Sequence, residues 1–291
     1  MEDGRGGHGR GRRAVRANRE AESETLVPGP RPAAMETDCD DVSVVREEGR
    51  ATVTLDRPGK LNALTGEMFA ALGDAFESFA EDPPDVVTVR GAGGNLSAGV
   101  DMSGVPGWAE ERPLAVRDQL ESVHESVRAI EEFDAPVVAA CEGHVLGGGL
   151  ELALACDLRV AAADATFGLP ESRMGLAMDV GGAQKLPGMV GEGLTKYLVM
   201  TGESIGAERA FRSGLVELLA AEGEFGSELA ALESSLAEKP TYVHGLAKRQ
   251  IHGVRPDVET GMSLAVHHAI AAYHEEETMD RVTGFLGEDG G

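Results

Sequence analysis

The chain has 291 residues, of which 42% are hydrophobic and 26% are charged, as in a folded globular protein with room for one large domain. Its net charge of −24 at pH 7 argues against nucleic-acid and anionic-membrane binding, and no apolar run approaches the roughly 18 residues of a membrane-spanning helix. Such acidity keeps a protein soluble where salt screens its self-repulsion, so we expect a halophilic protein. The N-terminus has no apolar signal sequence, so we expect a cytoplasmic protein.

Residues 1–34 differ from the rest of the chain. The run 4–13 is rich in arginine and glycine, and Pro28, Pro30 and Pro32 follow. With seven arginines and five acidic residues this segment is basic, and it lacks apolar periodicity. We expect a disordered extension, or an over-extended gene start with the protein beginning near Met35.

From Asp41 onward the hydrophobic pattern predicts alternating strands and helices. Strands are expected at 42–45, 51–55, 86–89, 136–140 and 158–161, the first two as a hairpin, and helices at 65–80, 113–133 and 150–155. After about residue 187 strand signals vanish, and helices are expected at 189–201, 206–213, 225–238, 240–252 and 258–275. This order predicts an α/β core over residues 35–225, followed by a helical region over residues 226–291.

Two glycine-bearing stretches follow predicted strands. Gly147, Gly148 and Gly149 open a helix, where close backbone approach and free N–H groups favour a negatively charged ligand. The stretch 91–101 also follows a strand, and two strand-end loops that each offer one N–H can form an oxyanion hole. Without a ligand, the same glycines would serve only as a tight turn, and they match neither the phosphate-loop nor the dinucleotide-binding pattern.

A third block combines residues 167–171 with residues 175–182. Together with the two glycine-bearing stretches and the run 55–64 (Leu-Asp-Arg-Pro-Gly-Lys-Leu-Asn-Ala-Leu), it resembles the crotonase superfamily of enoyl-CoA hydratases and isomerases over roughly residues 42–285. The resemblance implies a crotonase-like ββα spiral with C-terminal helices that build a homotrimer or homohexamer. It also implies an acyl-CoA substrate, with coenzyme A as part of the substrate and no separate cofactor.

The resemblance also implies roles for individual residues. The N–H groups of Val100 and Gly148 would hold the thioester oxygen, on which negative charge develops during reaction. The positions implied to bind the substrate or its CoA moiety are Lys60, Leu61, Ala63, Ala98, Asp101 and Gly147.

Two glutamates match the catalytic positions of hydratases. Glu151 lies on the first turn of the helix that begins near Gly148, and Glu171 follows Pro170 in the loop after the next strand. In hydratases, glutamates at these positions flank one water as general base and general acid. A single glutamate in so acidic a chain would more simply be a solvated charge, but both positions match.

Asp179 makes the catalytic assignment ambiguous. Hydratases have glycine at this position, whereas Δ3,5-Δ2,4-dienoyl-CoA isomerases have a similar stretch with a catalytic aspartate. Those isomerases, however, carry an aspartate where this chain has Glu151. A third carboxylate beside two others should raise at least one pKa. The alternative is that Asp179 caps a helix beginning at Val180.

Three functions therefore remain open. The first is hydration or double-bond isomerisation of an unsaturated acyl-CoA in fatty-acid breakdown, with a dienoyl-CoA isomerase as the specific alternative. The second is an RNA-binding crotonase-fold protein, suggested by the arginine- and glycine-rich run 4–13 and opposed by the acidity of the remaining chain. The third is another crotonase chemistry, such as thioester hydrolysis. No metal is expected, because neither the histidines nor the three cysteines show metal-binding spacing. The cysteines Cys39, Cys141 and Cys156 are interpreted as small buried residues or, for Cys39, as a tail residue.

Overall fold

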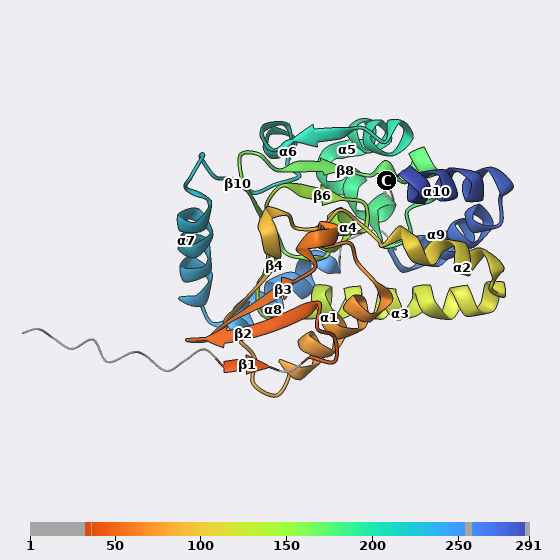
Figure 1. The fold of residues 1–291 in the computed structure, drawn as a ribbon. Helices are drawn as coiled ribbons and strands as arrows, with labels where there is room; N and C mark the ends of the chain where they lie inside the picture. The colour runs from red at the N-terminus through yellow and green to blue at the C-terminus, as the bar shows by residue number, and fades with distance from the viewer. Residues whose placement is uncertain (1–32, 36, 254–257, 289–291) are drawn as a thin grey trace, which may run out of the picture. The chain divides into compact units, whose positions relative to one another are not determined.

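The computed structural model describes residues 33–35, 37–253 and 258–288 (Figure 1). The extension predicted over residues 1–34 lies outside these residues except for its last two. Those two begin the short strand β1 (Ala33–Met35), which pairs antiparallel with the first strand of the predicted hairpin. At these two positions the chain is therefore strand rather than disordered.

A seven-stranded mixed sheet forms one layer of the core. Its order is β1, β2 (Val42–Glu47), β3 (Arg50–Leu55), β4 (Val86–Gly91), β5 (Val137–Cys141), β7 (Leu158–Ala161) and β10 (Leu218–Leu219). The predicted hairpin is confirmed, because β2 and β3 pair antiparallel, while every later pairing from β3 to β10 is parallel. The prediction of an α/β core is thus confirmed.

A smaller sheet contains β6 (His144–Leu146), β8 (Thr166–Gly168) and β9 (Ser204–Gly206). The expectation that strands end near residue 187 is wrong, since both β9 and β10 lie beyond it. These strands are two or three residues long, too short to give an alternating hydrophobic pattern. Strand β9 pairs antiparallel with β8, which also pairs parallel with β6, and β10 pairs parallel with β7. Each of these pairings joins strands that are far apart in the sequence.

The helices match most of the predicted segments. They are α1 (Gly66–Ser78), α2 (Val105–Glu110), α3 (Pro113–Glu132), α4 (Gly148–Ala155), α5 (Gly182–Thr201), α6 (Ala207–Ser213), α7 (Phe225–Ala237), α8 (Thr241–His252), α9 (Val258–Tyr273) and α10 (Glu276–Glu288). Short 3-10 helices are η1 (Pro58–Lys60), η2 (Ala92–Gly94), η3 (Met102–Gly104) and η4 (Pro170–Met174). Helices α2 and α10 were not predicted, and α5 begins seven residues before the predicted start at residue 189. None of these helices is long and apolar enough to cross a membrane, within the residues that the structure describes.

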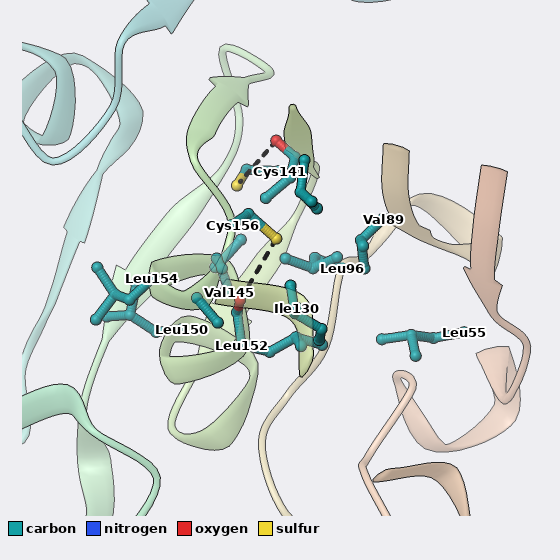
Figure 2. Close-up of a cluster of buried hydrophobic side chains, with 14 of the residues drawn as sticks. Leu55, Val89, Leu96, Ile130, Cys141, Val145, Leu150, Leu152, Leu154 and Cys156 are labelled. Carbon is teal, nitrogen blue, oxygen red and sulfur yellow. Dashed lines mark hydrogen bonds between the residues drawn. The ribbon is translucent and has the colours of Figure 1, made fainter. Parts of the chain in front are cut away.

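Helix α4 lies at the centre of the hydrophobic core. All eight of its residues are buried, and Figure 2 shows Leu150, Leu152 and Leu154 among side chains from the sheet and α3. The prediction that the three cysteines are small buried residues is confirmed, including Cys39, since all three are buried and free. A second cluster joins α2, α3, α9 and α10, which gather at one end in Figure 1.

Candidate active site

The turn into α4 brings two glycine-bearing loops into contact. Gly147 has a φ of 50° and a ψ of −129°, a conformation that side chains rarely adopt. At Gly148 a Cβ would lie 2.9 Å from Val100 Cγ2 and 3.5 Å from Val100 N, so glycine is required for this approach. The predicted oxyanion residues are therefore adjacent in the fold.

Both predicted N–H donors are unused. The segment around Val100 pairs with Leu64 through Leu64 N to Gly99 O (2.7 Å) and Asp101 N to Leu64 O (2.8 Å), which leaves the Val100 N–H outside this pairing. Gly148 is the first residue of α4, so its N–H has no acceptor within the helix. Neither N–H donates a hydrogen bond to any described residue, and together they can receive one anionic oxygen.

Glu151 is buried on the first turn of α4, with only 1% of its surface exposed. Its Oε1 accepts hydrogen bonds from the N–H groups of Val180 (3.1 Å) and Gly182 (2.7 Å). Burial and the negative charge of Asp179 raise the pKa of Glu151 to about 7, whereas the two donated hydrogen bonds oppose this rise. Glu151 therefore titrates near neutrality, with its ionised form held by backbone donors.

Glu171 lies on the first turn of η4, against the glycine turn. A Cβ on Gly147 would come within 3.0 Å of its Oε1. Its Oε2 is buried and has no hydrogen-bond partner within the described part of the chain. Burial and the neighbouring Glu151 raise the pKa of Glu171 to about 8, which favours a protonated carboxyl at neutral pH.

Asp179 is buried and does not cap a helix. Helix α5 begins at Gly182, its N-cap position is Gly181, and no side chain caps it, so the capping alternative is wrong. Instead, Asp179 Oδ2 accepts a hydrogen bond of 2.9 Å from the Tyr273 hydroxyl. Burial raises the pKa of Asp179 to about 6, although the hydrogen bond from Tyr273 lowers it. The fold thus brings all three predicted carboxylates together, since the charge of Asp179 raises the pKa of both Glu151 and Glu171.

An apolar cavity of about 500 Å³ opens beside Glu171. Its lining includes Leu176, Met178 and Val199, together with Ala265 from α9. The sequence did not indicate this cavity, because its walls come from η4, the loop 176–178, α5 and α9, which no local pattern connects. A cavity of this size and lining suits a flexible hydrocarbon chain.

The loop predicted to contact CoA runs beside the first oxyanion segment. Lys60 ends η1 with its side chain exposed, and Leu61 is exposed and has a left-handed φ of 49°. The carbonyl of Leu61 accepts a hydrogen bond from Ala98 N (2.9 Å), while the carbonyl of Ala63 accepts one from Arg57. Gly147 is buried and donates its N–H to Gly168 O (2.9 Å). Contact of these residues with CoA stays a prediction.

Asp101 and Asn62 hold this loop in place. The Asp101 carboxylate accepts hydrogen bonds from Arg57 (2.9 Å) and from the N–H and hydroxyl of Ser103 (3.0 and 2.7 Å). Burial raises the pKa of Asp101, but these hydrogen bonds outweigh it and leave the pKa below its usual value. Asn62 was not predicted. It is fully buried with a left-handed φ of 56°, which asparagine tolerates, and its side-chain amide donates to the carbonyls of Ala92 and Asn95.

Comparison with known proteins identifies the family of the chain. A family model described as enoyl-CoA hydratase/isomerase matches residues 46–286. The crotonyl-CoA hydratase of Syntrophomonas wolfei is 31% identical over 252 residues, which cover 85% of this chain and 95% of that protein. A probable mitochondrial enoyl-CoA hydratase 2 of Arabidopsis thaliana is 35% identical, covering 82% and 78% of the two chains. The crystal structure of an enoyl-CoA hydratase from Mycobacterium avium subsp. paratuberculosis superposes with a TM-score of 0.77 at 26% identity, covering 85% and 96%.

Proposed function

This chain belongs to the enoyl-CoA hydratase/isomerase family and is an enzyme of that family with a crotonase-like fold, and from this premise we propose that it adds water to the 2,3-double bond of a 2-enoyl-CoA thioester. The observation that carries the proposal is the pair of buried glutamates placed beside two unused backbone N–H groups. The thioester supplies the oxygen that these donors can receive, and the glutamates supply the proton transfers that hydration needs.

The oxyanion donors act on the thioester oxygen. When water adds at C3 of the enoyl group, negative charge moves onto this oxygen, and the N–H groups of Val100 and Gly148 stabilise it. Because the fold positions both donors before substrate binds, no reorganisation is needed as the charge develops. Loss of one such donor typically reduces kcat about 100- to 1000-fold.

The glutamates divide the proton transfers between them. Glu151, whose ionised form is held by two N–H groups, acts as the base that removes a proton from water. Glu171, whose pKa is raised to about 8, is the acid that delivers its proton to C2. One C–O bond and one C–H bond form as the double bond is lost, after which a proton passes from Glu151 to Glu171 and restores the starting state.

Asp179 supports isomerisation as the second candidate. It is buried beside Glu151 and Glu171, rather than solvated, so it can take part in proton transfer at a more distant carbon. In a 3,5-dienoyl-CoA, one carboxylate would remove a proton at C2 and another would deliver one at C6. Product analysis with crotonyl-CoA and a 3,5-dienoyl-CoA, on wild type and Asp179→Asn, separates the two functions. Hydration of crotonyl-CoA by wild type, at whatever rate it persists in Asp179→Asn, together with no dienoyl turnover, would favour the hydratase.

The acyl chain has a candidate position in the apolar cavity beside Glu171. This cavity lies next to the acid that serves C2, and its lining of Leu176, Met178, Val199 and Ala265 would exclude water from a chain longer than four carbons. We therefore expect turnover of substrates longer than crotonyl-CoA. A strict restriction to four carbons would contradict this position of the chain.

Self-association into a homotrimer or homohexamer is proposed from the surface of α8. Four large hydrophobic side chains of this helix are exposed: Tyr242, Val243, Leu246 and Ile251. Tyr242, Val243 and Leu246 fall within about 100° around the helix axis, and an exposed apolar face of this kind is typical of a subunit contact. Light scattering of the native protein tests this, and a monomer at micromolar concentration would contradict it.

A cytoplasm of high salt remains the proposed setting. The net charge of −24 destabilises the folded chain by self-repulsion, which salt screens. The unfolding temperature should therefore rise with KCl. Full folding and activity at low salt would count against this proposal.

A further inference from the structure

Tyr273 connects the C-terminal helices to the carboxylate group. It is the last residue of α9, only 4% exposed, and its ring packs edge-on against Trp108 with centroids 5.4 Å apart. Its hydroxyl donates the 2.9 Å hydrogen bond to Asp179 Oδ2. The two residues are 94 positions apart in the sequence, so this contact exists only because α9 returns to the active site.

The loop that carries Asp179 is held at two further points. The carbonyl of Asp179 contacts Nε2 of the buried His124 on α3, and Thr278 of α10 donates its hydroxyl to Gly175 O (3.1 Å). A Cβ on Gly175 would lie 2.8 Å from that hydroxyl oxygen, so the loop and α10 are in close contact. The backbone near Asp179 is therefore fixed without Tyr273, and the specific contribution of Tyr273 is to the carboxyl group.

The charges around Asp179 explain why a neutral donor is needed there. Glu151 on α4 and Glu171 on η4 lie close enough to Asp179 that its charge raises the pKa of each. His124 on α3 is buried, which lowers its pKa, and it contacts the Asp179 carbonyl rather than the carboxyl. Lys185 on α5 is paired with Glu131. The Tyr273 hydroxyl, whose own pKa is raised by burial and by Asp179, therefore favours ionised Asp179 without giving up its proton.

We propose that Tyr273 is a positioning residue for the reaction: its hydroxyl orients the Asp179 carboxyl and keeps it ionised, and ionised Asp179 in turn keeps one proton on the glutamate pair. This inference rests on the proposed function, because the shared proton is the one that Glu171 delivers. Asp179 then acts as a buried negative charge that makes a carboxylic acid available at neutral pH. Helix α9 thereby contributes to the chemistry as well as to packing.

The test is the pH dependence of kcat/KM in Tyr273→Phe, which keeps the ring against Trp108. Loss of a hydrogen bond to a charged group corresponds to a pKa rise of about 1–2 units. Asp179 would then be protonated over part of the active range, which removes the charge that raises the pKa of both glutamates, so both limbs of the profile should move to lower pH by about 1 pH unit. An alkaline limb that stays in place in the folded variant would overturn the proposal.

Two comparisons separate this role from a loss of packing. Tyr197→Phe removes a hydroxyl from a partly exposed tyrosine whose ring packs with Arg209, and its profile should match wild type. In an Asp179→Asn background, Tyr273→Phe should cause no further shift, because the group on which it acts is gone. An equal shift in both backgrounds would contradict a role through Asp179.

A readout without turnover distinguishes failure of this inference from failure of the proposed function. The infrared difference spectrum of wild type minus Asp179→Asn reports the Asp179 carboxyl directly. At pH 7 it should show an ionised carboxylate in wild type, a measurement that does not depend on Tyr273→Phe being folded. A protonated Asp179 at pH 7 would overturn the inference, whereas an ionised one in a protein that does not hydrate enoyl-CoA would refute only the proposed function.

Discussion

Replacement of Gly148 by alanine should remove most of the hydration activity and leave the protein folded. A Cβ at this position would lie 2.9 Å from Val100 Cγ2 and 3.5 Å from Val100 N. Because the first distance is well inside the 3.5–4.0 Å optimum for carbon atoms, the two loops must separate, and their N–H groups can no longer share one oxygen. We expect a fall in kcat of about 100- to 1000-fold. The free energy of unfolding should fall by about 1–3 kcal/mol, the usual cost of overpacking.

The assay is hydration of crotonyl-CoA, followed as loss of the ultraviolet absorbance of the conjugated thioester, with the unfolding temperature measured in parallel. Gly66→Ala is the matched control. Gly66 is the first residue of α1. Apart from its chain neighbours and the nearby backbone of α1, no described atom lies within 4 Å of the added Cβ. This variant should keep wild-type activity. A folded Gly148→Ala enzyme with near wild-type kcat would refute the assignment of the Gly148 N–H to the oxyanion hole.

Three further predictions concern the carboxylates and the cavity. Glu151→Gln and Glu171→Gln should each lower hydration about 100- to 10,000-fold, while Glu208→Gln, at an exposed helical ion pair, should not, as steady-state rates will show. Burial raises the pKa of Glu171 to about 8, above the value of about 4.3 in an unfolded chain, so between these values the folded state binds more protons and its stability falls as pH rises. Urea unfolding from pH 5 to pH 8 should therefore show a smaller decline in Glu171→Gln than in wild type, and equal declines would contradict the raised pKa. Ala177→Phe should fill part of the cavity and lower kcat/KM for an eight-carbon enoyl-CoA at least about 10-fold more than for crotonyl-CoA, whereas equal losses would place the chain elsewhere.

The parts of the fold that follow local rules could be predicted from the sequence. Alternating apolar residues over 42–55 predicted the hairpin, and the apolar run 136–140 predicted a buried strand. The start of α5 was missed because Gly181, Gly182 and Pro187 are typical helix breakers. The helix accommodates Pro187 within its first two turns, and the bend follows at Gly191, where φ is 77°.

The candidate site could be predicted only in part, because local sequence patterns identify residues that are close together in the chain but not contacts between distant segments. Glu151 and Gly148 lie on one turn and Glu171 follows a short strand, so a motif could identify them. The ionisation of Asp179, in contrast, depends on Tyr273, and the cavity depends on α5 and α9 meeting η4. Contacts between segments about a hundred residues apart leave no local pattern, so sequence reasoning could assign Asp179 either to a helix cap or to catalysis but could not choose.

The most direct test of the proposed chemistry is product analysis after reaction of crotonyl-CoA in ¹⁸O-labelled water. Hydration by the two glutamates should give 3-hydroxybutyryl-CoA that carries the label at C3, formed by wild type and lost in Glu171→Gln. Absence of labelled product from the wild-type enzyme, together with rapid isomerisation of a 3,5-dienoyl-CoA, would contradict it and assign the three carboxylates to double-bond migration.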